Sequence, residues 1–274
     1  MAAKRSRPPR GQDPRALRVR HFAKLDRDRA RRVGVPEVIL GEGKSVDHLI
    51  GILEALAARG LGALVSRPSA EQLRAMRSWR PRSGRARRLR FLAQGRLVRL
   101  PGPLGPRYRN GLAAVITAGT GDVPLAEEAR TVLRELGVRV VRQYDVGVAG
   151  LHRLLSAIHR LEARRPEVYL VFAGREGALP TVVAGLVRAP VVAVPTSIGY
   201  GRGGRGEAAL NAMLQSCAPL AVVNIDAAVP AALFVAQHFA ERPGTAVGGA
   251  GGSSPSPEGA RTRPRRKLRR EKGF

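Results

Sequence analysis

The chain has 274 residues, a formal net charge of +27 and a single cysteine. One cysteine excludes an internal disulfide, which favours a reducing compartment, and no apolar run reaches the ~18 residues that cross a membrane. Because no apolar stretch follows the basic N-terminus, the sequence predicts a cytoplasmic protein without a secretory signal and without membrane contact.

The positive charge comes almost entirely from arginine, with 43 arginines and 5 lysines. Such a charge is typical of nucleic-acid-binding proteins. Much of it, however, gathers in residues 1–32, 77–99 and 261–270, and aromatic residues make up 4% of the chain, too few for base-stacking surfaces. The Gly-, Ser- and Pro-rich stretch 244–259 cannot bury a core. We therefore expect disordered basic ends, at 1–18 and 241–274, and no specific nucleic-acid partner.

The sequence pattern of residues 19–107 predicts a small α/β region. Ser45 is placed as the N-cap of an amphipathic helix, since its hydroxyl can accept a bond from a first-turn amide. The expected elements are short strands at 36–40 and 61–66, helices at 46–58 and 71–78, and a half-buried strand pair at 88–100.

Residues 108–240 repeat a strand–helix alternation five times. Pro124 suits a first helical turn and Gly137 a helix end. The expected strands are 111–119, 138–145, 167–174, 190–197 and 220–226. The expected helices are 123–136, 151–164, 179–187, 207–216 and 231–240. The strands are apolar throughout, which is typical of a parallel sheet covered by helices on both faces.

This alternation predicts a three-layer, doubly wound parallel sheet of flavodoxin-like type, with the N-terminal α/β region beside it. Turns after parallel strands collect at one edge of the sheet, where ligands bind. We therefore expect the turns at 118–122, 174–177, 195–201 and 216–218 to lie near one another.

Several side chains in these turns have both a structural and a functional interpretation. Cys217 is either a nucleophile or a small buried residue, and Asp122 is either a helix N-cap or a ligand contact. Glu176 is a general base or a solvated loop residue. Backbone amides of 120–123 and 197–201 suit phosphate, while His152 is interpreted as structural. The five histidines show no metal-ligand spacing, so we predict no protein-bound metal.

Ordered motifs through residues 20–228 carry a family resemblance. The N-terminal ones are 25–32, which begins LD and ends at Arg32, then 34–38 (GVPEV) and 43–44 (GK). The later ones are 118–129 (AGTGDVPLAEEA), 145–153 (DVGVAGLHR), 176–180 (EGALP), 194–201 (VPTSIGYG), 216–218 (SCA) and 223–226 (VNID). On these motifs the chain resembles the LarB family, carboxylase/hydrolases that begin synthesis of the nickel-pincer nucleotide cofactor. Its C-terminal half also resembles the aminoimidazole ribonucleotide carboxylases.

The resemblance implies a reaction on nicotinic acid adenine dinucleotide. Carbon dioxide or bicarbonate is the co-substrate for carboxylation at ring carbon C5. Hydrolysis of the phosphoanhydride then leaves pyridinium-3,5-biscarboxylic acid mononucleotide and AMP. No tightly bound cofactor is implied, Mg²⁺ can accompany the substrate phosphates, and a homo-oligomer is expected.

The resemblance also implies roles for single residues. Cys217 would form a transient adduct with the ring, and Glu176 would move the proton or activate water. The implied substrate contacts are Gly119, Thr120, Asp122, His152, Arg153, Thr196, Ser197, Gly199, Tyr200 and Gly201.

The chain departs from the family pattern at Gly121, Arg175, Gln215, the loop 202–205 and residues 227–230. Two alternatives remain open at this point. One is a purine-pathway carboxylase or mutase on the same scaffold. The other is a non-catalytic basic protein whose nucleic-acid binding would fall steeply with salt.

Overall fold

A computed structural model describes residues 16–82, 88–105, 108 and 110–240. The described residues belong to one compact unit and contain two main sheets. The basic ends expected at 1–15 and 241–274 lie outside the described residues. Residues 16–18, which we assigned to the disordered end, instead begin strand β1 (Ala16–Val19). The boundary was wrong because Leu17 is an apolar residue that becomes buried in the N-terminal core.

The N-terminal part is a small mixed sheet with its own core. Strand β1 pairs antiparallel with β2 (Ala23–Asp26), and the four-stranded sheet has the order β3-β4-β6-β5. The strands of that sheet are β3 (Val38–Leu40), β4 (Ala63–Ser66), β5 (Arg90–Leu92) and β6 (Leu97–Leu100). The helices are α1 (Arg29–Val33), α2 (Val46–Ala57) and α3 (Ala70–Ser78). The strand pair expected at 88–100 is confirmed as the antiparallel β5–β6 pair.

Capping explains where the two longer N-terminal helices begin. The Ser45 hydroxyl accepts a bond from the His48 amide at the start of α2, as predicted. At α3, Ser69 and Gln72 form a reciprocal capping box. Gln72 also donates to the carbonyls of Gly41 and Lys44, which ties α3 to the turn after β3.

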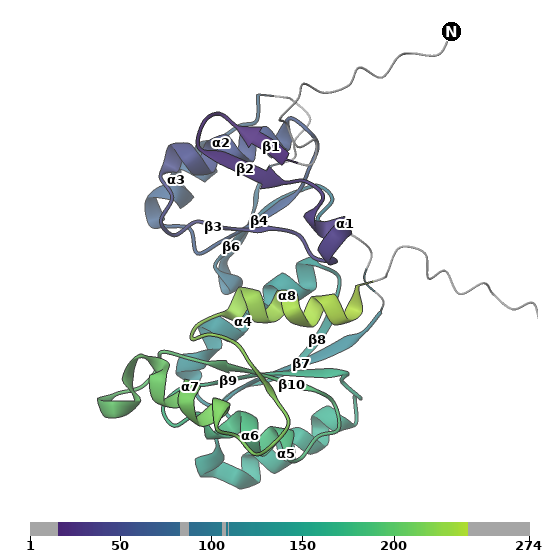
Figure 1. Ribbon diagram of the computed structural model, residues 1–274, viewed down its shortest axis with the longest axis vertical. Helices are drawn as coiled ribbons and strands as arrows, with labels where there is room; N and C mark the ends of the chain where they lie inside the picture. Colours follow the sequence, from purple (N-terminus) through teal and green to yellow (C-terminus); the bar gives the residue numbers. More distant parts are fainter. Residues whose placement is uncertain (1–15, 83–87, 106–107, 109, 241–274) are drawn as a thin grey trace, which may run out of the picture. The chain divides into compact units, whose positions relative to one another are not determined.

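The C-terminal part is the predicted five-stranded parallel sheet (Figure 1). Its order, β11-β10-β9-β7-β8, is the flavodoxin-like order, so the predicted fold class is confirmed. The strands are β7 (Leu112–Thr117), β8 (Arg139–Gln143), β9 (Val168–Ala173), β10 (Val191–Pro195) and β11 (Ala221–Val222). The helices are α4 (Val123–Glu135), α5 (Leu151–Glu162), α6 (Ala178–Ala184), α7 (Glu207–Leu214) and α8 (Ala228–Phe239).

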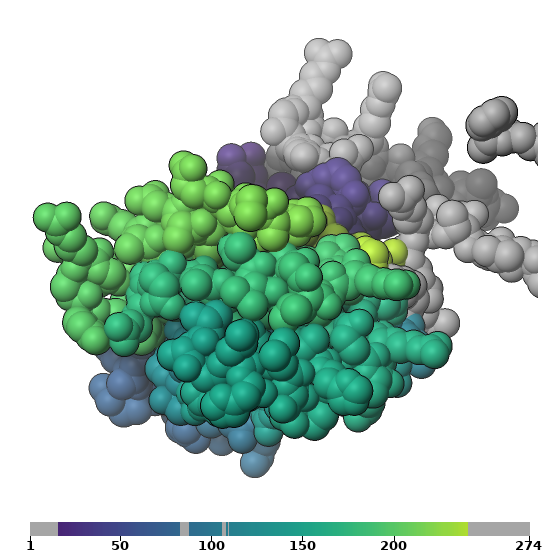
Figure 2. Space-filling model, turned by 90° about the horizontal axis from the view of Figure 1, so that it is seen from below, coloured from purple at the N-terminus to yellow at the C-terminus, as the bar shows by residue number. Residues whose placement is uncertain are grey.

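Alternate residues of the central strand β9 divide the core into two layers. Leu170 and Phe172 pack with α4 and α8, whereas Tyr169 and Val171 pack with α5, α6 and α7. Figure 2 views the molecule from the side on which α5 and α6 lie in Figure 1. The first layer also includes Leu64 and Leu97 of the N-terminal sheet, so the two parts share a core through α4 and α8.

The last strand is much shorter than predicted. We expected residues 220–226, but β11 is only Ala221–Val222. Past Val222 the chain still follows β10, because the amides of Val223 and Asp226 donate to the carbonyls of Ala193 and Pro195. Asp226 then takes a left-handed backbone conformation (φ 55°), and α8 starts at Ala228, three residues earlier than expected. Among the described residues, no helix combines the length and apolar character needed to cross a bilayer.

Candidate functional site

A pocket of about 490 Å³ opens at the carboxyl ends of β7 and β9. These two strands flank the point where the sheet order reverses, which is where flavodoxin-like sheets bind ligands. The pocket is lined by small residues of the turns after β7, β8 and β9, and by four charged side chains. The charged side chains are Asp122, Arg153, Arg175 and Glu176. Its volume lies within the range of small-molecule sites.

The turn after β7 holds a buried carboxylate at the pocket. Asp122 is 3% exposed. Its Oδ1 accepts a bond from the Thr196 hydroxyl (2.6 Å) and its Oδ2 accepts one from the Gly119 amide (2.9 Å). It occupies the N-cap position of α4 but makes no side-chain capping bond there. The side chain therefore holds two turns together instead of capping the helix.

Burial raises the pKa of Asp122, and the bonds from Thr196 and Gly119 oppose that rise. The negative charge of Asp226 adds to the increase. A buried carboxyl with a raised pKa in a pocket is a frequent sign of a functional group.

The turn after β9 is packed tightly against the turn after β10. A Cβ atom added at Gly174 would lie 2.0 Å from the Ile198 carbonyl oxygen and 2.7 Å from the Thr196 hydroxyl oxygen. The Arg175 amide also donates to the Ile198 carbonyl (3.0 Å). Only glycine allows the two turns to approach this closely.

The exposed side chains of this turn point to the pocket mouth. Glu176 lines the pocket, and its side chain is 63% exposed. The Arg175 guanidinium lies 5.0 Å from the centre of the Tyr200 ring, a cation–π contact. Arg153 donates to the backbone carbonyl and the carboxylate of Asp145 (3.1 and 3.3 Å). The pocket thus combines two guanidinium groups, which suit phosphate, with two carboxylates, which suit proton transfer.

Four of the predicted site residues line this pocket: Gly119, Asp122, Arg153 and Glu176. Two more, Thr196 and Ser197, support it through hydrogen bonds, because Thr196 binds Asp122 and the Ser197 amide donates to Asp226 Oδ1 (2.8 Å). The remaining predicted contacts do not line the pocket but lie on the neighbouring turns or helix starts. They are Thr120, His152, Gly199, Tyr200 and Gly201.

The turn that contains Cys217 does not join the others, which corrects our expectation for residues 216–218. Cys217 is exposed and is not among the residues that line the pocket. It follows the carboxyl end of α7, and the chain then enters β11 parallel to β10, so Cys217 lies toward the amino end of the sheet. The Ser216 hydroxyl accepts a bond from Thr181 of α6, which fixes the turn at this position.

Two residues that sequence reasoning did not assign belong to the support of the site. Asp226 holds the Ser197 amide, and Arg67 of the N-terminal part donates to the Asp226 carbonyl (2.6 Å). An aspartate at the end of the expected strand 220–226 could have been noticed as a residue that tolerates positive φ. Nothing in the local sequence of Arg67 distinguishes it from the other arginines. Within the described residues, no three His, Cys, Asp or Glu side chains gather to hold a metal ion. That the protein binds no metal stays a prediction.

Comparisons with known proteins agree with this architecture. A family model described as the LarB/PurE-like N-terminal domain matches residues 17–98, and one described as AIR carboxylase matches residues 112–245. The uncharacterized protein MJ0165 of Methanocaldococcus jannaschii is 38% identical over 214 residues, which cover 77% of this chain and 81% of the relative.

Two further relatives match the C-terminal part. An N5-carboxyaminoimidazole ribonucleotide mutase of Methanocaldococcus jannaschii is 30% identical over 135 residues, covering 47% of this chain and 79% of the mutase. A crystal structure of Treponema denticola PurE is 25% identical, with a TM-score of 0.41, and covers 47% of this chain and 80% of that one.

Proposed function

Because the chain belongs to the LarB/PurE-like family of carboxylases and mutases, we propose that it carboxylates nicotinic acid adenine dinucleotide at ring carbon C5 and hydrolyses its phosphoanhydride. The products are pyridinium-3,5-biscarboxylic acid mononucleotide and AMP. The observation that carries the proposal is the pocket at the β7–β9 switch point, with Asp122, Glu176 and two arginines at one opening.

The proposed chemistry uses the Cys217 thiolate. The sulfur adds to C4 of the cationic ring, which gives a neutral enamine whose C5 carries the electron density. C5 then attacks carbon dioxide and forms the new carbon–carbon bond. Loss of the C5 proton to Glu176 returns an electron pair to the ring, the C4–S bond breaks and aromaticity is restored. Water then attacks one phosphorus of the anhydride and releases AMP.

The charged groups of the pocket suit the rest of this substrate. Guanidinium groups such as Arg153 and Arg175 hold phosphate oxygens through paired hydrogen bonds. Glu176 is accessible to a bound ring because most of its side chain is exposed at the pocket mouth. Mg²⁺ on the substrate phosphates would add to this binding and requires no protein ligand.

Glu176 and Cys217 can act on one ring only if the thiol reaches the pocket from elsewhere, since Cys217 does not line the pocket of its own chain. We therefore include a homo-oligomer in the proposal, in which Cys217 of one chain enters the pocket of another. Leu214, beside this turn, is an apolar side chain left 63% exposed, as a residue at such a contact would be.

Product analysis with isotope-labelled bicarbonate tests the proposal. The full chain is incubated with nicotinic acid adenine dinucleotide and ¹³C-bicarbonate, and the products are identified by mass spectrometry. We expect the labelled dicarboxylated mononucleotide together with AMP. A parallel reaction with aminoimidazole ribonucleotide tests the purine-pathway alternative, which similarity over residues 112–245 favours. Turnover of that substrate alone would overturn the proposal.

A further inference from the structure

A buried ion pair joins the N-terminal part to the site domain. Arg67, directly after β4, donates through Nε and Nη2 to both carboxylate oxygens of Glu128 on α4, at 2.9–3.1 Å. The Glu128 side chain is 0% exposed and that of Arg67 is 22% exposed. A carboxylate this deeply buried requires a charged partner.

The same guanidinium also reaches the turn before α8. Arg67 Nη2 donates to the backbone carbonyl of Asp226 at 2.6 Å. Arginine is suited to this double contact because its planar group presents several N–H donors in fixed directions. Arg67 itself has a left-handed backbone (φ 49°), and its amide donates to the Arg96 carbonyl (3.1 Å), which holds the side chain in this direction.

Asp226 is in turn hydrogen-bonded to the end of β10 and to the turn that follows it. Its amide donates to the Pro195 carbonyl at the end of β10 (2.9 Å), and its Oδ1 accepts from the Ser197 amide (2.8 Å). Thr196, which lies between Pro195 and Ser197 in the chain, donates through its hydroxyl to the pocket carboxylate of Asp122 (2.6 Å). Three hydrogen bonds, joined through residue Asp226 and through the backbone of 196–197, thus connect Arg67 to the pocket.

We propose that Arg67 is a positioning residue through which the N-terminal part holds the site loop, residues 196–201, at the pocket. Only the turnover readout of this inference rests on the proposed function. The structural readout, hydrogen exchange of the loop, needs no substrate. The N-terminal part thereby has a role in the site although none of its described residues lines the pocket.

The test uses Arg67→Lys, which keeps a cation near Glu128 but cannot contact Glu128 and the Asp226 carbonyl with one rigid group. We expect amide hydrogen exchange of the peptide containing Ser197 to accelerate about tenfold or more, with exchange in β9 unchanged. In the reaction with nicotinic acid adenine dinucleotide, KM should rise about fivefold or more with little change in kcat, because the loop forms part of the pocket wall at Ile198 and supplies no reacting group.

Arg90→Lys is the matched control. Arg90 of β5 pairs with Glu135 on the same helix α4 (3.3 Å), so it also joins the two parts, but its hydrogen bonds among the described residues go to Glu135 alone. We expect this variant to leave both loop exchange and KM at the wild-type values. If Arg67→Lys behaves like Arg90→Lys, the proposal is wrong.

A second pair of variants keeps the test decisive if Arg67→Lys does not fold. Asp226→Gly tolerates the positive φ but removes the acceptor of the Ser197 amide, so it should accelerate exchange of the loop. Asp226→Asn keeps an amide oxygen there and should not. Unchanged exchange in Asp226→Gly overturns the proposal. If both single variants fold, combining them should add little to either, because the two contacts act in series on the same loop through Asp226. Absence of product from the wild type would overturn the proposed function while leaving the exchange result to decide the role of Arg67.

Discussion

The turns at the two ends of the C-terminal sheet are held in different ways. At the carboxyl end, three turns are joined to one another: Asp122 bonds Thr196 and Gly119, and Gly174 packs against Ile198. The turn with Cys217, toward the amino end, is held by Ser216 bonds to Thr181 and within the turn, and its thiol is exposed. The first arrangement is a formed pocket, whereas the second leaves a thiol exposed at the surface.

A set of motifs shared with a family therefore does not imply a site within one chain. The resemblance assigns Glu176 and Cys217 to the same reaction, while the fold of a single chain places them toward different ends of the sheet.

The largest effect on carboxylation is expected when Cys217 and Glu176 are each removed from a different chain of the oligomer. Cys217→Ser and Glu176→Gln should each lower carboxylation by about three orders of magnitude or more, since serine is a far weaker nucleophile and glutamine cannot accept the proton. When both variants are coexpressed, random assembly should restore about a quarter of the sites, because an intact Glu176 pocket can receive an intact Cys217 from the other chain.

The measurement is the specific carboxylation activity of the whole coexpressed mixture, without selection of mixed oligomers, against that of each variant alone. Coexpression of two differently tagged Cys217→Ser chains is the control, and it should show no recovery. A mixture no more active than the single variants would contradict a site shared between chains.

The second prediction concerns the close packing of Gly174 against Ile198 at the carboxyl end of the sheet. Gly174→Ala should lower kcat/KM about 100-fold, because the new methyl group would force the turns at 174 and 198 apart and misplace the pocket groups. Gly204→Ala is the matched control, since a Cβ there meets nothing within 4 Å and its φ is −68°. Kinetics and thermal unfolding of both variants check this. Equal kcat/KM values for the two variants would show that activity does not require the close approach of Gly174 to Ile198.

A smaller effect is expected on the protonation of Asp122. The charge of Asp226 raises the pKa of Asp122, so Asp226→Asn should lower that pKa by removing a neighbouring negative charge. Carboxyl ¹³C titration by NMR measures it. In Asp145→Asn, which removes a carboxylate bonded to Arg153 instead, the pKa of Asp122 should stay at its wild-type value. An upward change in Asp226→Asn would refute the electrostatic account.

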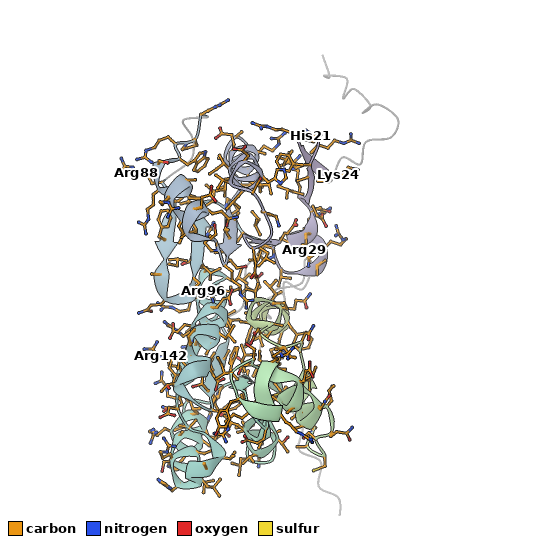
Figure 3. All side chains as sticks on the ribbon, turned by 90° about the vertical axis from the view of Figure 1, so that its left-hand side faces the viewer. His21, Lys24, Arg29, Arg88, Arg96 and Arg142 are labelled. Atoms are coloured by element: carbon orange, nitrogen blue, oxygen red, sulfur yellow. The ribbon has the colours of Figure 1, made fainter. Side chains whose placement is uncertain are left out.

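The smallest effect concerns the arginine-rich ends. A chain lacking 1–15 and 243–274 should keep turnover within about twofold, because segments of such composition cannot build a packed site. Its binding to heparin should weaken, since the truncation removes a large share of the positive charge. Exposed arginines such as Arg88 and Arg142 remain on the folded part (Figure 3). A large loss of turnover in the folded, truncated chain would show that the ends take part in the reaction.

The fold class, the capping of α2 by Ser45 and most strand and helix positions could be predicted from the sequence, because these depend on local periodicity and end signals. The sequence also indicated Gly119, Asp122, Arg153 and Glu176, since residues after parallel strands share one edge of the sheet.

Tertiary structure alone decided the rest. Whether Asp122 caps its helix or bonds Thr196 depends on which turn packs beside it, and the role of Arg67 depends on contacts 61 and 159 residues away in the chain. The bond from the Ser197 amide to Asp226 depends on Asp226 lying beside the end of β10, and the place of Cys217 follows from the direction in which α7 returns across the sheet. None of these is a local property, because each arises from packing between segments distant in sequence.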